Sequence, residues 1–182
     1  MMAGSHRVSI GVSEAAARIL EAQGVAHALE GVWTPNDAER AGAWDLLVEL
    51  VTRVSIVPLH PDSGFMSEAL SSLHALFDAG RSALQRHGPA VAQQRRGELS
   101  LATIVAYLLN RVLRPVLADW HPIVEQHEKA GGPEWDVLSA SLREILGALQ
   151  GLIAEYAKEL AHACDADEFV RFLLDEGMHY RR

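Results

Sequence analysis

Two residues that could carry out acid–base and phosphate chemistry stand close together in the stretch LNRVLRPVLADWHP, residues 109–122. Arg114 and His121 are seven positions apart, so a helix would place them on one face, about 10 Å apart along its axis. A histidine changes charge near neutral pH and can transfer a proton, whereas an arginine offers a planar fork of donors that matches a phosphate. Arg114 and His121 are therefore a candidate catalytic pair for phosphate chemistry.

The spacing of this pair resembles the motif of the HEPN ribonucleases, which are also helical bundles. The resemblance implies that His121 would transfer a proton and Arg114 would stabilise phosphate charge, at an interface between two copies. It rests on two residues and a fold class, and Pro115 stands where the family usually has a polar residue. A second stretch, from Arg81 to His87, fits the same loose spacing with five intervening residues.

Nine histidines and one cysteine raise the question of a metal or a nucleophilic site. The pattern Glu-x-x-His of carboxylate-bridged metal bundles occurs at Glu159 and His162 and again at Glu176 and His179. Neither pair has an evident inward-facing acid on another helix, so we expect solvated histidines and no metal. Acids surround Cys164, and they would raise its thiol pKa.

Several motifs that carry chemistry are absent from the sequence. It has no glycine-rich phosphate loop, no Gly-x-Ser-x-Gly and no Cys-x-x-Cys. We therefore expect no cofactor, and an enzyme is the less favoured interpretation.

The composition limits the remaining classes of function. A chain of 182 residues suits one domain of ordinary size, and 49% apolar with 22% charged residues is a globular balance. A net charge of −8 argues against binding to nucleic acid, which requires clustered lysine and arginine. A single cysteine fits the cytoplasm, and charges interrupt the apolar runs, so we expect no membrane span.

Four long amphipathic segments must position these residues. Apolar residues recur at helical spacing over 34–54, 65–87, 99–129 and 134–163, and prolines or glycines separate the segments. Long helices with short connections predict an all-α fold, an antiparallel bundle of four long helices. We expect Trp44, Leu73, Phe77, Leu108, Leu142 and Leu149 to be mostly buried in it.

The ends of the chain carry weaker patterns. Residues 13–23 and 165–177 predict short additional helices, whereas VAHALEGVW, residues 25–33, fits a strand or irregular chain. We expect an N-terminal arm with a short helix over residues 1–33 and a helical bundle domain over residues 34–182.

A proline interrupts the third long segment. Pro115 has no amide hydrogen to donate to the carbonyl oxygen of Arg111, and its ring presses against that carbonyl. The third helix should therefore kink at Pro115.

The sequence favours a non-catalytic helical bundle that acts as a protein-interaction adaptor, regulator or subunit. One candidate surface is the third helix, with Arg111, Arg114 and Trp120, because tryptophan and arginine are enriched at binding hot spots. The other is the terminal apolar segment with Phe169 and Phe172, which would mark an interface if it is exposed.

The surplus of apolar helix faces predicts association with a protein partner or a second copy. Either the segment 168–174 or an outer stripe of the third helix should form the contact; the stripe comprises Leu109, Leu113 and Leu117. A contact of this kind usually buries more than about 2,000 Å² in total.

Two other functions fit the same residues. One is the HEPN-like ribonuclease that uses Arg114 and His121. The other is a small-molecule sensor that binds an apolar or anionic ligand between the helices, with Arg111 or Arg114 as the charge partner. The stretch 109–122 also resembles, in its general character, helical accessory proteins from bacterial defence or signalling gene clusters.

Overall fold

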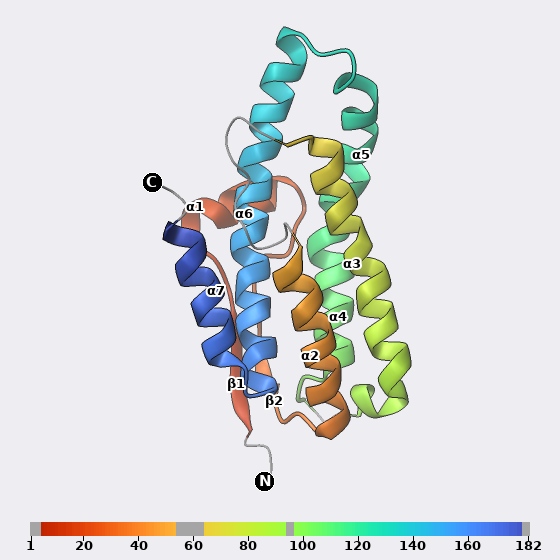
Figure 1. The fold of residues 1–182 in the computed structure, drawn as a ribbon, viewed down its shortest axis with the longest axis vertical. Helices are drawn as coiled ribbons and strands as arrows, with labels where there is room; N and C mark the ends of the chain where they lie inside the picture. Colours follow the sequence, from red (N-terminus) through yellow and green to blue (C-terminus); the bar gives the residue numbers. More distant parts are fainter. Residues whose placement is uncertain (1–4, 54–63, 94–96, 180–182) are drawn as a thin grey trace.

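The fold is mostly α-helical and includes one small sheet (Figure 1). The computed structural model describes residues 5–53, 64–93 and 97–179, with side chains described up to residue 174. Two strands, β1 (His6–Ile10) and β2 (Leu29–Trp33), flank the helix α1 (Glu14–Ala22). The helices that follow are α2 (Asp37–Thr52), α3 (Met66–His87), α4 (Leu101–Tyr107), α5 (Arg114–His127), α6 (Pro133–Ala163) and α7 (Asp167–His179). The mostly helical prediction is confirmed, and the sheet corrects the all-α class.

The long helices run along the long axis of the molecule (Figure 1). α2 packs on α3 and on α6, and α3 also packs on α5. α2 is capped by Asn36, whose side chain accepts from the amide of Glu39 while the Glu39 side chain accepts from the amide of Asn36. Glu39 is buried, and its Oε1 also accepts from the indole nitrogen of Trp33 and from the amide of Leu101. This carboxylate therefore ties β2 and α4 to the start of α2.

The N-terminal strands share the core of the helices. β1 and β2 pair antiparallel, with His6 opposite Trp33 and Ile10 opposite Leu29. Val8 and Trp33 are fully buried and belong to the same hydrophobic cluster as the helices. Beyond β2, the amide of Leu99 donates to the carbonyl oxygen of Val32 over 2.7 Å.

Five of the six core positions expected from the sequence are buried: Leu73, Phe77, Leu108, Leu142 and Leu149. The prediction is wrong for Trp44, which is 46% exposed. α2 carries apolar residues on several faces, and the face that turns inward contains Leu46, Leu47 and Leu50. Helical spacing alone does not identify that inward face.

The third long segment is a continuous run of α4, a π-helical stretch η2 (Leu108–Leu113) and α5, with Pro115 at the start of α5. Pro115 has no amide hydrogen to donate to the carbonyl oxygen of Arg111. This oxygen instead accepts a hydrogen bond from the amide of Ala26 over 2.9 Å. The loop between α1 and β2 is thus attached to the third segment where the proline removes a donor.

The expected outer stripe of this segment is wrong, because Leu109, Leu113 and Leu117 are all buried. A Cβ added at Gly80 of α3 would lie 3.0 Å from Leu109, so α3 covers this side closely. The α1–β2 loop also contacts the segment, at Arg111. The apolar residues of this segment therefore serve the protein's own core.

Two runs, Leu101–His127 and Pro133–Ala163, are long and apolar enough to cross a membrane by length and composition alone. Each run contains an 18-residue window with few charges, so the expectation that no segment spans a membrane stays a prediction. About half of each apolar window is buried within the fold, as in core helices of soluble proteins, so the observation is weak evidence for a span.

Candidate functional site

Three large aromatic side chains lie exposed on α2 and α7. Trp44 is 46% exposed, Phe169 is 40% exposed and Phe172 is 63% exposed. The rings of Trp44 and Phe169 pack against each other, with centroids 6.0 Å apart and planes tilted by 44°. We call Trp44, Phe169 and Phe172 the aromatic surface. An exposed group of large apolar side chains is the feature that marks an interaction site on a protein surface.

Each of the two helices is anchored on one face and leaves its aromatic residues on the other. In α7, Val170 is buried in the core, which turns Phe169 and Phe172 outward. In α2, Trp44 lies one turn after the exposed Ala41 and one turn before the half-buried Val48. This stripe continues the aromatic surface along α2.

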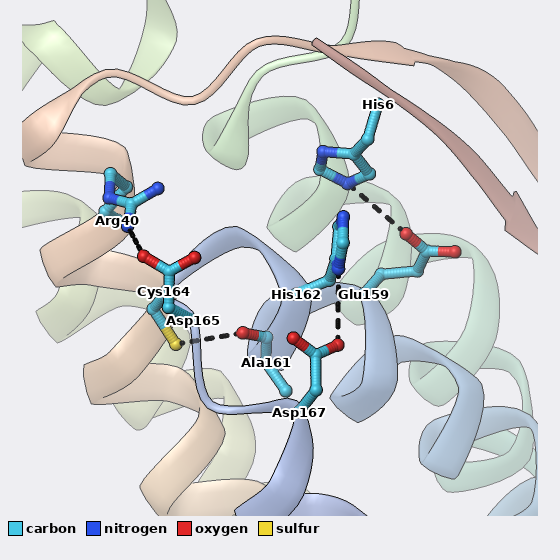
Figure 2. A network of polar contacts seen from close by, with 8 residues as sticks. All are labelled: His6, Arg40, Glu159, Ala161, His162, Cys164, Asp165 and Asp167. Carbon is cyan, nitrogen blue, oxygen red and sulfur yellow. Dashed lines mark hydrogen bonds and ion pairs between the residues drawn. The ribbon is translucent and has the colours of Figure 1, made fainter. Parts of the chain in front are cut away.

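A polar network holds the start of α7 in place (Figure 2). Arg40 of α2 forms an ion pair with Asp165, in the turn between α6 and α7. Asp165 has a φ of 57°, a left-handed conformation that reverses the chain there. His162 of α6 contacts Asp167 at the start of α7, with Nδ1 and Oδ1 3.2 Å apart. These contacts position α7 relative to α2, and so position Phe169 beside Trp44.

The same network reaches β1 through two more residues. Nε2 of His6 lies 3.4 Å from Oε2 of Glu159, and Oε1 of Glu159 accepts from the amide of Ser9 over 3.2 Å. Figure 2 shows His162 between His6 and Asp167, and the two histidine rings meet edge to face at 4.6 Å. Burial, and next the neighbouring His162, lower the pKa of His6 below its ordinary value.

The Glu159–His162 motif therefore has neighbours that the sequence pattern does not reveal, because His6 and Asp167 come from β1 and α7. No group of three metal-ligating side chains exists among the residues that the structure describes. The side chains of Glu176 and His179, the second motif, lie outside the described part of the chain.

Cys164 lies at the end of α6, half-buried. Its Sγ lies 3.6 Å from the carbonyl oxygen of Ala161, to which the thiol donates. Burial is the main cause that raises the pKa of the Cys164 thiol, and the acids at 165 and 167 add to it. The pKa direction expected from the sequence is correct, but the largest cause is burial rather than nearby acids.

The residues predicted on the third segment have partners within the chain. Trp120 is only 7% exposed, and its indole nitrogen donates to Oε1 of Gln23 over 2.9 Å. Arg114 is exposed, donates to Oδ1 of Asn110 over 2.9 Å and lies over the ring of Phe77 at 5.4 Å. Trp120 is therefore a core residue, and Arg114 already has a hydrogen-bond acceptor and an aromatic neighbour.

Arg111 is exposed at the edge of a shallow surface hollow of about 530 Å³. Tyr107 and His27 also line this hollow, and so does the acidic Glu21, which contacts His27 at 3.4 Å.

His121 lies against α3. Its ring meets that of His74 edge to face, with centroids 5.9 Å apart, and its Nε2 is buried with no hydrogen-bond partner among the described residues. Burial, and next His74, lower the pKa of His121. His121 and Arg114 thus contact different residues of α3, His74 and Phe77.

Both ends of the second Arg–His stretch are occupied by ion pairs. Arg81 pairs with Asp78, and Nε2 of His87 lies 2.8 Å from Oδ2 of Asp45. The first of these contacts lies within α3, and the second links α3 to α2.

Comparison of the chain with protein-family models, with curated proteins and with solved structures finds no match.

Proposed function

We propose that this protein is a non-catalytic interaction module that binds a partner protein through the aromatic surface of α2 and α7. The observation that carries the proposal is the exposure of Trp44, Phe169 and Phe172 together on two helices that are otherwise anchored in the core. Aromatic residues dominate binding energy at interfaces because they bury a large area with few rotatable bonds.

The rest of the fold would serve as the scaffold of this surface. We propose that α2, α3, the α4–α5 run and α6 form one antiparallel bundle whose third helix is kinked at Pro115. The packing of α2 on α3 and α6, and of α3 on α5, supports the bundle. The π-helical stretch next to Pro115 supports the kink, because such irregular turns bend helices. A rigid scaffold lowers the entropy lost on binding.

The geometry supports the other two functions less well. A ribonuclease would need Arg114 and His121 to meet one phosphate, whereas Arg114 already binds Asn110 and the Nε2 of His121 is enclosed. A sensor would need a cavity between the helices, whereas Arg111 lines a shallow hollow that also contains Glu21.

The proposal is tested by a binding selection that does not require the partner to be identified first. The full chain would be immobilised and exposed to a displayed library of helical peptides, and each enriched peptide would then be measured on the double variant Phe169→Ser/Phe172→Ser. We expect enriched peptides that bind the natural chain and lose at least about tenfold in affinity for the variant, as hot-spot truncation does.

Phe65 provides a matched control, because it is 64% exposed at the start of α3 and lies outside the aromatic surface. Phe65→Ser should leave the selected peptides bound. Peptides that bind the double variant as well as the natural chain, or a library that yields no binder above background, would contradict the proposed function.

A further inference from the structure

We infer that the partner segment of the aromatic surface is basic: apolar anchors with lysine or arginine residues clustered at one end. This inference rests on the proposed function and adds the chemistry of the partner to it.

The first observation is where the carboxylates lie. α2 and α7 both begin at the end of the molecule where α6 stops (Figure 1). Four acidic side chains gather at these two beginnings, and all four are exposed: Asp37, Asp165, Asp167 and Glu168. The aromatic surface thus has one acidic end.

The second observation is that the arginines of this region do not cancel the acids. Arg40 pairs with Asp165, and Arg171 pairs with Glu168. Among the described side chains of α2, α7 and the turn before α7 at this end, four carboxylates against two guanidinium groups leave a formal charge of −2, carried by Asp37 and by Asp167, which contacts the imidazole of His162. A partner that approaches this end therefore meets net negative charge.

The third observation is that the surface farther along both helices is apolar among the residues whose side chains the structure describes. Farther along α2, Trp44 is followed one and two turns later by the half-buried Val48 and Val51. Farther along α7, Phe172 is exposed and Leu173 is half-buried. Up to Val51 on α2 and Leu174 on α7, the surface changes from acidic to apolar in the direction in which both helices run.

This polarity disfavours a second copy of the chain as the occupant. Two copies related by a two-fold axis present the same patch to each other. The carboxylates of one copy would then face either the carboxylates or the apolar residues of the other. The first arrangement is repulsive, and the second removes charges from water without a partner. A segment with cations at one end and apolar anchors at the other satisfies both ends.

The test uses two synthetic helical peptides on the full chain. Both carry the same apolar anchors at helical spacing, and one end carries three lysines in the first peptide and three glutamates in the second. Binding is measured by fluorescence anisotropy of the labelled peptide. At low salt we expect the lysine peptide to bind roughly three- to tenfold tighter, since exposed charge pairs each contribute little and like charges oppose binding by similar amounts.

Two controls tie that preference to the acidic end. Raising the salt to about 0.5 M should reduce the difference between the peptides, because exposed charges are screened. The variant Asp37→Asn/Asp167→Asn should reduce the same preference, whereas Phe172→Ser should weaken both peptides and Phe65→Ser neither. Far-ultraviolet circular dichroism of each variant confirms that it is folded.

Each contrary result has a distinct meaning. Equal affinity of the two peptides, or a preference for glutamate, overturns the basic partner and leaves the interaction surface in place. Binding of neither peptide at about 1 mM also overturns it, and the display selection then decides separately whether the surface binds anything. A dimer in sedimentation that Phe172→Ser dissociates and Phe65→Ser does not would assign the surface to a second copy.

Discussion

Two tryptophans in this molecule show how differently the same residue type is used. Trp120 on α5 is 7% exposed, and its indole N–H has an acceptor on Gln23. Trp44 on α2 is 46% exposed, and its ring packs on Phe169, itself partly exposed. Residue type predicts a binding hot spot equally well for both. The difference lies in whether another part of the chain covers the ring and satisfies its polar edge.

The same contrast extends to the two regions around them. The third segment contains most of the residues that the sequence suggests for a site. Other residues of the same chain already form hydrogen bonds with them: Asn110 with Arg114, Gln23 with Trp120, and Ala26 with the carbonyl oxygen of Arg111. On α2 and α7 the polar contacts fix the helices and leave the aromatic rings exposed.

The largest expected effect comes from replacing each tryptophan with alanine. Trp120→Ala should lower the free energy of unfolding by about 3–5 kcal/mol, because it leaves a cavity in the core and an unpaired Gln23. Trp44→Ala should lower it by about 1 kcal/mol or less, as for an exposed position. Urea unfolding followed by circular dichroism gives both values. Similar losses for the two variants would remove the contrast.

The next effect concerns the attachment of the α1–β2 loop. Pro115→Ala introduces an amide that can compete with Ala26 for the carbonyl of Arg111. The stability gained from helix propensity and lost from the loop should nearly cancel, within about 2 kcal/mol. Hydrogen exchange at the amide of Ala26 should nevertheless become faster. Unchanged exchange there would show that the loop is held independently of the proline.

A smaller effect is expected for the exposed phenylalanines. Phe172→Ser and Phe65→Ser should each change the free energy of unfolding by about 0.5 kcal/mol or less, because both side chains are mostly in water. Thermal unfolding of the two variants checks this. A large loss for Phe172→Ser alone would mean that the α7 face supports the fold rather than binding.

The smallest effect should come from pH. The pKa of His6 and that of His121 are both lowered by burial first and by a second histidine next. The unfolded chain therefore binds protons more readily, so this stability is present above the ordinary histidine pKa of about 6.5 and declines as pH falls below it. His6→Gln and His121→Gln should each flatten the thermal midpoint between pH 5 and 7. A midpoint that rises on acidification would contradict the sign.

Local patterns predict the helices well but not which of their faces are covered. Prolines and glycines mark the breaks between the long helices, and the stripes of α3 and α6 give correct core positions such as Leu73 and Leu149. α2 and the third segment carry apolar residues on more than one face, so spacing misassigns Trp44 and Leu113. Burial there depends on segments that lie far away in the sequence.

The candidate site is only partly predictable for the same reason. Phe169 and Phe172 stand out in the sequence as an apolar segment in excess of the bundle's needs, and both are exposed. The polar network that positions α7 does not stand out in the sequence. Glu159 contacts His6, which is more than 150 positions away in the sequence, and the strand β1 that carries His6 is only five residues long. A strand this short carries too few alternations to be recognised.

The outer sides of the two-stranded sheet affect how safely this protein can display exposed aromatic rings. Unpaired strand edges are templates for aggregation. Here the amide of Leu99 donates to the carbonyl oxygen of Val32 on the outer side of β2, and the amide of Ser9 on β1 donates to the carboxylate of Glu159. Each strand thus has a backbone group withdrawn from intermolecular pairing. These two contacts reduce the number of backbone groups through which another chain could extend the sheet, in a molecule that also exposes aromatic side chains on α2 and α7.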